Sequence, residues 1–531
     1  MKNIYINIGF FIGIIVLLGT NACKDNINPP LEELDFVRVF TPLELTAKIS
    51  NQTTLELNWG FNKGISSYVV EISQDSLDFS DIIYTATVAL NELPFVYALP
   101  SGDTQYSARV KGVSSTAGVE DSKWSAIAFK SLPENLFEGY QIKMTAIGAI
   151  TVSWLPGKAV TALTFVTQSG ETSFDISAEE ATAGSKSVTG VANAVYEIRL
   201  MNNAAVRGTQ NYVLEGDVLV ASGTDLAAAI AAASAGDVIV LEENGMYPFV
   251  GDLTIDKSLK IKGINGMGLP VLYLTSGDRM FYIGSSLTPA DSLVFENLYI
   301  SGFINHNAGD GQHRGVFDME SEACNLGALK FIGCKLYDLG RQLLRLRGGS
   351  DQTIGLFLID DCIIHNLGNS SASYGVLSAD QTNTNIKIIK VMNSTIDSLK
   401  SHFLRYDDAT DCESITLQNC TFNRTPYSSG RYFSDTRNAV ITDGFYVTNC
   451  IFGSTSYGDT PSIYGIRVAD GVALTIKNSY STSDFVLTDY SVMNDQLTPL
   501  EITSDALWSD PTGMDFTFKG AGIDAGDPRW K

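Results

Sequence analysis

Charged side chains recur at matching positions of six short segments, and their spacing could support chemistry. The segments are RGVFDMES from Arg314, QLLRLRGG from Gln342, YGVLSADQ from Tyr374, SHFLRYDD from Ser401, GRYFSDTR from Gly430 and YGIRVADG from Tyr464. Successive side chains of a β-strand point to opposite faces. The alternation therefore predicts these inward residues: Phe317, Met319, Leu344, Leu346, Leu377, Ala379, Leu404 and Tyr406.

The polar residues between them form two expected outward columns. The first contains Asp318, Arg345, Ser378 and Arg405 and continues to Arg467, and the second contains Glu320, Arg347, Asp380 and Asp407. Adjacent strands lie about 4.8 Å apart, so each column is a compact row of carboxylates and guanidinium groups. Residues 431–437 fit either register and stay unassigned.

These columns allow three interpretations. Their carboxylates could hold Ca²⁺ while their arginines bind the carboxylates of an acidic glycan. They could instead form an exposed ladder of ion pairs, each contributing ~0–1 kcal/mol. A glycoside hydrolase would need two acids at a set separation, but the neighbours in Asp360-Asp361 and Asp407-Asp408 face opposite sides of a strand.

The strands that carry these columns belong to a repeat. Its copies, 26 to 36 residues apart, read VFENLYI from Val294, KFIGCKL from Lys330, LIDDCII from Leu358, KVMNSTI from Lys390, TLQNCTF from Thr416, YVTNCIF from Tyr446 and TIKNSYS from Thr475. Repeats of this length indicate a solenoid, because one unit cannot bury its apolar face until a neighbour stacks on it. Two strands per copy plus one charged strand predict a right-handed parallel β-helix.

A polar residue separates the two strands of each copy. The bend residues are Asn297, Gly333, Asp361, Asn393, Asn419, Asn449 and Asn478. Asn tolerates a left-handed bend, and stacked Asn side chains can hydrogen-bond to one another. The position after the bend holds four of the seven cysteines, Cys334, Cys362, Cys420 and Cys450. We expect buried free thiols rather than disulfides or a metal site, because no metal-binding Cys spacing occurs.

Short alternating segments dominate residues 41–132, which predicts a β-sandwich. Trp59 and the LPSG sequence leading to Tyr106 resemble the core tryptophan and tyrosine corner of a fibronectin type III domain. A weaker copy covers residues 133–216, with Trp154 and Tyr196 as its expected core pair. We expect Trp59 and Trp154 to be buried and both sandwiches to act as spacers.

Residues 217–531 resemble the β-helix of pectate-lyase-like proteins. Asp225 offers a helix N-cap, an apolar run follows to Ala235, and Gly236 is expected to end the helix, as in the cap of such proteins. The segment IRVAD from Ile466 is similar to a calcium-binding segment of pectate lyases, and residues 515–531 resemble their closing segment. The Trp-Asp-His segment of the best-known pectate lyase family has no counterpart.

This resemblance implies Ca²⁺-assisted β-elimination of an acidic plant glycan, in which a base removes the proton beside the uronate carboxylate. It implies Arg345 and Arg405 as candidate bases and Arg347 and Arg467 as substrate-binding residues. The implied metal ligands are Asp318, Glu320, Asp380 and Asp407. A non-catalytic glycan-binding protein is the alternative.

The N-terminus resembles that of a lipoprotein. An apolar run from Ile4 to Leu18 is shorter than the ~20 residues that cross a bilayer, so residues 1–22 are expected to be an export signal and Cys23 the lipidated residue. Residues 23–40, with an acidic patch, indicate a tether and display at the outer surface of the outer membrane. An ordinary signal peptide that contains a cysteine is the alternative.

The charge composition limits the classes of binding partner that we expect. The 531 residues carry 36 basic and 59 acidic side chains, a net charge of −23 spread along the chain. Nucleic acid is therefore not an expected partner, because phosphate contacts need a basic face. The chain resembles accessory lipoproteins of glycan-utilisation systems, and a polysaccharide is the expected partner.

Overall fold

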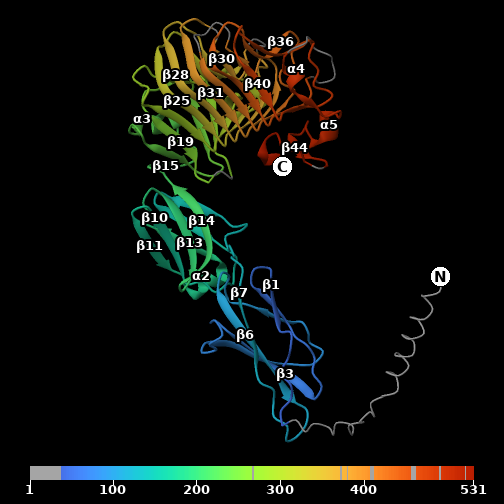
Figure 1. The fold of residues 1–531 in the computed structure, drawn as a ribbon. Helices are drawn as coiled ribbons and strands as arrows, with labels where there is room; N and C mark the ends of the chain where they lie inside the picture. Colours follow the sequence, from blue (N-terminus) through green and yellow to red (C-terminus); the bar gives the residue numbers. More distant parts are fainter. Residues whose placement is uncertain are drawn as a thin grey trace, which may run out of the picture. The chain divides into compact units, whose positions relative to one another are not determined.

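The computed structural model describes residues 37–265, 268–370, 374–379, 381–406, 412–455, 462–488, 492–520 and 522–531. Nearly all regular structure is β, and the chain packs as two compact units (Figure 1). Among the described residues, no helix is both long and apolar enough to span a membrane. The predicted all-β fold class is confirmed.

The first sandwich has two antiparallel sheets, as the alternating segments predict. One sheet has the order β1 (Thr46–Ser50), β2 (Thr54–Asn58), β5 (Phe95–Ala98), and the other β4 (Ile82–Val88), β3 (Ile65–Ser73), β6 (Gln105–Ser114), β7 (Ser125–Lys130). Trp59 is buried and meets the Tyr68 ring edge-on at 5.2 Å. The Tyr106 hydroxyl donates to the Ser101 carbonyl over 3.2 Å, which forms the predicted tyrosine corner.

The second sandwich has one sheet of four strands and one of three. Their orders are β11 (Gly170–Asp175), β10 (Ala162–Thr167), β13 (Ala194–Asn202), β14 (Ala205–Leu214), and β12 (Ser185–Thr189), β9 (Ala149–Ser153), β8 (Ile142–Ala146). A short helix, α2 (Ala178–Ala183), precedes β12. Trp154 and Tyr196 are both buried, so the prediction that Trp154 lies in the core is confirmed.

The β-helix that follows is built from three parallel sheets. Sheet I contains β15 (Val218–Val220), β16 (Val238–Leu241), β19 (Leu259–Gly263), β22 (Ser292–Glu296), β25 (Cys324–Ile332), β28 (Gln352–Asp360), β31 (Thr384–Met392), β34 (Cys412–Gln418), β37 (Ile441–Thr448) and β40 (Leu474–Lys477). Sheet II contains β17 (Met246–Val250), β20 (Val271–Ser276), β23 (Tyr299–Ser301), β26 (Lys335–Tyr337), β29 (Ile363–Leu367), β32 (Thr395–Leu399), β35 (Thr421–Asn423), β38 (Ile451–Phe452), β41 (Tyr480–Ser481) and β42 (Thr498–Pro499).

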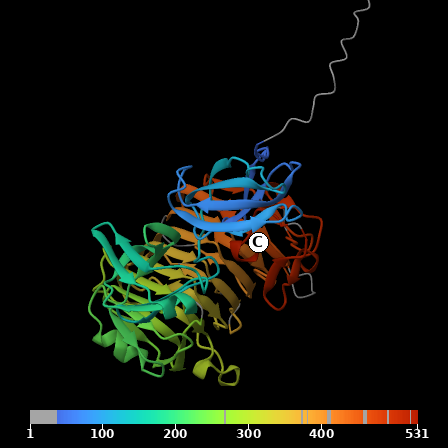
Figure 2. The same ribbon diagram turned by 90° about the horizontal axis from the view of Figure 1, so that it is seen from below.

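Sheet III carries the charged segments. It contains β18 (Leu253–Ile255), β21 (Arg279–Ile283), β24 (Gly315–Met319), β27 (Gln342–Leu346), β30 (Leu377–Ala379), β33 (Leu404–Arg405), β36 (Arg431–Thr436) and β39 (Ile463–Val468). The colours run in order from green to red along the β-helix in Figure 2, since each turn lies beside the next. One hydrophobic core fills the interior from Val220 to Leu497.

The bends between sheets I and II follow the predicted Asn pattern. All seven predicted bend residues have a φ between +44° and +62°, the left-handed region that Asn and Gly tolerate. The Asn419 side chain donates to Asn393 over 2.9 Å, and Asn449 and Asn478 continue the row with bonds of 3.1 and 2.8 Å. We call this row the asparagine ladder.

The cysteines after the bends are buried free thiols, as predicted. They stack from turn to turn, since the Cys334 amide donates to the Cys362 sulfur over 3.4 Å. Burial raises the pKa of the Cys362 and Cys420 thiols well above the ordinary value. These thiols are therefore packing groups of the interior.

The two ends of the β-helix are covered by short elements. Helix α3 (Leu226–Ala232) begins at Asp225, whose carboxylate accepts from the Ala227 amide over 2.9 Å, and buries Leu226 and Ile230. The predicted end at Gly236 is wrong. The helix stops at Ala232 because the Asp237 carboxylate accepts from the Ser234 amide over 2.7 Å and the chain at Ala233 is extended.

At the far end lie α4 (Val492–Gln496), α5 (Ser504–Leu507) and the hairpin of β43 (Trp508–Asp510) with β44 (Asp515–Phe518). The chain then runs back along the bends as far as η3 (Pro528–Trp530). We call residues 524–530 the C-terminal strap. It crosses successive turns: Asp524 accepts from Asn478, Gly526 donates to Asn449, and Asp527 bonds to Thr421 and Thr395.

Candidate functional site

Sheet III brings the first predicted column together in unbroken register. Pairing places Asp318 beside Arg345, Arg345 beside Ser378, and Ser378 beside Arg405. Asp435 then lies between Arg405 and Arg467, which assigns the register of residues 431–437. The column is therefore Asp318, Arg345, Ser378, Arg405, Asp435 and Arg467, and we call it the arginine column. The eight residues expected to face inward are all buried.

Several side chains of the arginine column are buried. Asp318 and Ser378 are fully buried, and Asp435 is 4% exposed, whereas the three arginines are half-buried. The carboxylate oxygens of Asp318 and the hydroxyl of Ser378 make no hydrogen bond within the described residues. Asp318 instead has an ion pair with Arg347, whose Nε lies 3.3 Å away. The column is therefore partly buried and not uniformly exposed to solvent.

A second set of charges surrounds the first end of the column. Glu320 accepts from Arg279 over 2.9 Å and from Arg347 over 3.0 Å, and Arg279 also pairs with Asp252. The bond from Arg279 lowers the pKa of the Glu320 carboxyl. Burial works against the charge of Arg279, but the bond to Glu320 and the neighbouring negative groups outweigh it and raise its pKa. Glu320 and Arg279 therefore stay charged.

Tyrosine rings lie against the arginines of the column. The Arg345 guanidinium is 4.2 Å from the centre of the Tyr374 ring, and that of Arg467 is 4.0 Å from Tyr432. Tyr432 stacks on Tyr464 at 4.8 Å. Arg467 also makes a two-point contact with Asp435, its Nε lying 2.9 Å from Oδ1. These contacts hold the guanidinium planes in fixed orientations.

Two histidines lie near sheet III, and both are neutral at ordinary pH. Burial lowers the pKa of His402 to about 4, although the Asp435 charge acts in the opposite direction. The same cause lowers the pKa of His313 to about 4. His402 Nδ1 lies 2.9 Å from the Tyr432 carbonyl oxygen. His402 therefore supports the strand that carries Tyr432 and adds no charge to the column.

The predicted calcium ligands differ in their surroundings. Ca²⁺ takes six to eight oxygen ligands, yet Asp318 and Glu320 each lie against an arginine. No group of three His, Cys, Asp or Glu side chains suited to a metal occurs within the described ranges. Asp380 and Asp407, the other two predicted ligands, lie outside the described residues. The described residues alone do not assemble a calcium site.

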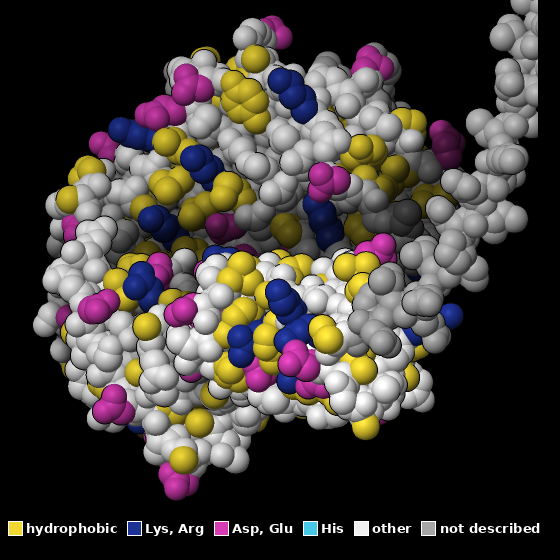
Figure 3. All heavy atoms as spheres, turned by 60° about the horizontal axis from the view of Figure 1, so that its bottom comes forward, with side chains coloured by type: hydrophobic (Ala, Val, Ile, Leu, Met, Phe, Trp, Pro, Cys, Tyr) yellow, Lys and Arg dark blue, Asp and Glu magenta, His cyan; other side chains and the backbone are white. Residues whose placement is uncertain are grey.

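Sequence reasoning missed several neighbours of the column: Arg279, Tyr374, Asp435, Tyr432 and Tyr464. The available signal for two of these tyrosines was the repeated Tyr-Gly at 374 and 464, which lies four residues before Ser378 and three before Arg467. Overall surface charge gives little guidance, since basic and acidic side chains are interspersed over the face drawn in Figure 3. The candidate site is identified by the strand register, which aligns the residues of the arginine column.

The fold and this face define a class of protein: fibronectin type III-like sandwiches joined to a parallel β-helix with a polar column on one sheet. Two protein-family models match parts of the β-helix. One is a domain of unknown function, DUF4957, over residues 245–399, and the other a domain of unknown function, DUF5123, over residues 415–530. No curated protein matches the chain.

Solved structures resemble the sandwiches. A two-domain fibronectin type III segment of chicken tenascin is 16% identical, with 33% of this chain and 98% of that chain covered and a TM-score of 0.24. The FN1–FN3 domains of chicken CNTN1 are 18% identical, with 34% of this chain and 68% of that chain covered and a TM-score of 0.15. The matches carry no information about the column on sheet III.

Proposed function

We propose that the outer face of sheet III binds an acidic polysaccharide. The observation that supports this most is the regular placement of Arg345, Arg405 and Arg467 on every second strand of the sheet. Two strand spacings amount to about 9.6 Å. A straight row of cations at one interval suits a linear polymer whose carboxylates also recur at one interval.

The tyrosines add a second kind of recognition. Tyr374, Tyr432 and Tyr464 are half-buried and lie beside the arginines. Aromatic rings offer flat apolar faces with a polar edge, which suits the apolar face of a sugar ring. Because the chain carries a net charge of −23, a polyanion is repelled over about 10 Å at 0.1 M salt. Binding therefore needs the local cations of this column.

Ca²⁺-assisted β-elimination is the second candidate. The Asp318 carboxylate supports this candidate. It is buried without a hydrogen bond, and burying such a group costs free energy that a bound cation would offset. Arg345 and Arg405 are its candidate bases, and Asp318, Glu320, Asp380 and Asp407 its candidate ligands. Arg347 would then help to orient the substrate, although it is paired with Asp318 and Glu320.

The same proposal places the protein at the cell surface. Lipid on Cys23 would anchor the mature chain to the outer membrane, residues 23–40 would act as a tether, and the sandwiches would hold the β-helix away from it. The N-terminal 36 residues lie outside the described part of the chain. Support for this location comes from their sequence alone.

The direct test is titration of the soluble mature chain with polygalacturonate and with neutral galactan. We expect binding of the acidic polymer only, weakening as salt rises. Equal binding of both, or of neither, would contradict the proposal. The absorbance of unsaturated uronate, followed with and without Ca²⁺, separates a lyase from a binding protein.

A further inference from the structure

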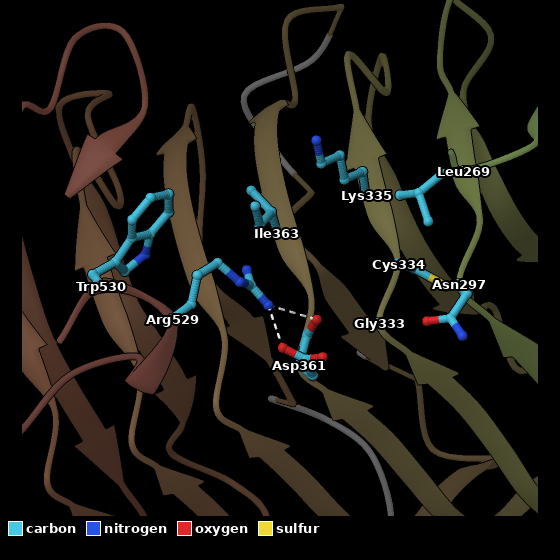
Figure 4. Close-up of a pocket in the computed structure, with 9 residues that line it drawn as sticks. All are labelled: Leu269, Asn297, Gly333, Cys334, Lys335, Asp361, Ile363, Arg529 and Trp530. Carbon is cyan, nitrogen blue, oxygen red and sulfur yellow. Dashed lines mark hydrogen bonds and ion pairs between the residues drawn. The ribbon is translucent and has the colours of Figure 1, made fainter. Parts of the chain in front are cut away.

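A groove of about 410 Å³ lies at the bends between sheets I and II of the β-helix (Figure 4). Residues that line it include Asn297, Gly333, Lys335, Asp361, Arg529 and Trp530. They come from bends of the ladder, from β26 and from the end of the C-terminal strap. The arginine column contributes no residue to this groove.

The groove exists because the asparagine ladder is interrupted. Gly333 occupies a ladder position with φ +62°, and a Cβ there would lie 2.3 Å from Asn297 Oδ1. In the later turns an Asn side chain fills the corresponding space and bonds to its neighbour. The Asn297 side chain makes no such bond within the described residues. Its amide is therefore available to a ligand.

The C-terminal strap ends at this interruption and forms one wall. Arg529 donates to the Asp361 carbonyl over 2.7 Å and pairs with its carboxylate, as the dashed lines in Figure 4 show. The Trp530 indole Nε1 donates to Thr395 Oγ1 over 2.7 Å, and its ring meets Phe516 at 5.8 Å. The half-buried Trp530 ring is thus held in one orientation before any ligand arrives.

The length of the groove follows from the strand register. Lys335 pairs with Ile363, and Ile363 with Thr395, which holds Trp530. The backbone of Lys335 therefore lies two strand spacings, about 9.6 Å, from that of Thr395, the residue that bonds the indole. Lys335 is exposed and has no ion pair with a described residue. An unpaired cation and a fixed aromatic ring lie at opposite ends of a short groove.

A ligand in the groove must be bound by side chains, because the backbone groups around it are already hydrogen-bonded to one another. The backbone amides of Asn297, Gly333 and Asp361 donate to the backbone carbonyls of Ile332, Asp360 and Met392, respectively. An added peptide strand would need free backbone groups. A sugar needs a ring to stack on and polar side chains for its hydroxyl groups. We propose that this groove is a second saccharide site, which binds a short acidic oligosaccharide through Trp530, Asn297 and Lys335.

The sharpest variant is Gly333→Asn, which extends the ladder into the groove. Asn is the residue found at most ladder positions and tolerates the positive φ. Its Cβ would lie 2.3 Å from Asn297 Oδ1, so the Asn297 side chain must turn aside, which the end of a side chain can do without unfolding the bend. We expect about tenfold weaker binding of trigalacturonate, equivalent to about 1.4 kcal/mol. Lys335→Gln should also weaken it, whereas the control Lys390→Gln, an exposed lysine of β31, should not.

The readout is calorimetry together with the indole NMR signal of Trp530, assigned by its loss in Trp530→Phe. Trigalacturonate should shift this signal, and maltotriose or triglutamate should shift it less. Unchanged affinity in Gly333→Asn, an unmoved indole signal or an equal response to triglutamate would each overturn the proposal. Arg345→Ala/Arg405→Ala leaves this groove intact, so failure of the binding face and failure of the groove are distinguishable.

Discussion

At the scale of single residues, the arginines of sheet III differ in their surroundings. Arg467 is held by Asp435 and by the ring of Tyr432, while Arg345 lies on Tyr374. Arg347, at the first end, is committed to Asp318 and Glu320. We therefore assign Arg347 a role in holding the two carboxylates.

Histidine burial predicts a pH dependence of stability. The pKa values of His313 and His402 are lowered to about 4 in the folded chain, against about 6.5 when unfolded. Between these values the unfolded chain binds more protons, so stability falls as the pH drops from 6.5 to 4. Each histidine accounts for at most about 3 kcal/mol of this loss.

The measurement is the midpoint of denaturant unfolding across that pH range. His402→Asn, whose amide can replace the bond of Nδ1 to the Tyr432 carbonyl, should show a smaller decline than the parent. Values at pH 7 to 8 provide the control, since both histidines are neutral there. An equal decline in parent and variant would refute the assignment for His402.

At the scale of elements, the asparagine ladder predicts a graded loss of stability. Asn419 has φ +54°, donates to Asn393 and accepts from Asn449. Asn419→Ala loses two hydrogen bonds and places Ala in a left-handed bend, a cost of about 2–4 kcal/mol. Asn419→Gly loses only the bonds and should cost about half as much in denaturant unfolding. Equal losses would mean that the backbone conformation contributes nothing.

The elements also show why some features were predictable from sequence. Period-two alternation and the recurring bend residue predicted the strands, the buried thiols and the inward set of sheet III. The segment at 431–437 was ambiguous because its inward position holds the polar Ser434, which pairs with Leu404 and Ile466. The burial of Asp318 and the groove beside Gly333 depend on neighbouring turns and on the strap, which no local pattern encodes.

At the scale of the whole molecule, the lipid anchor makes a separate prediction. Cys23→Ser should move the protein from the membrane fraction to the soluble fraction, because covalent lipid supplies the attachment. The measurement is cell fractionation with detection of the full chain, and Cys324→Ser serves as a cysteine control within the β-helix. A membrane-bound Cys23→Ser variant would contradict the lipoprotein interpretation.

The binding face on sheet III is tested most directly by affinity electrophoresis of two double variants in gels containing polygalacturonate. Arg345→Ala/Arg405→Ala removes two cations from the column, and Lys387→Ala/Lys390→Ala removes two exposed cations from β31 of sheet I. Both change the net charge equally. Our account predicts that only the arginine variant loses retardation, by about tenfold in affinity or 1.4 kcal/mol. Equal retardation of the two variants would contradict it.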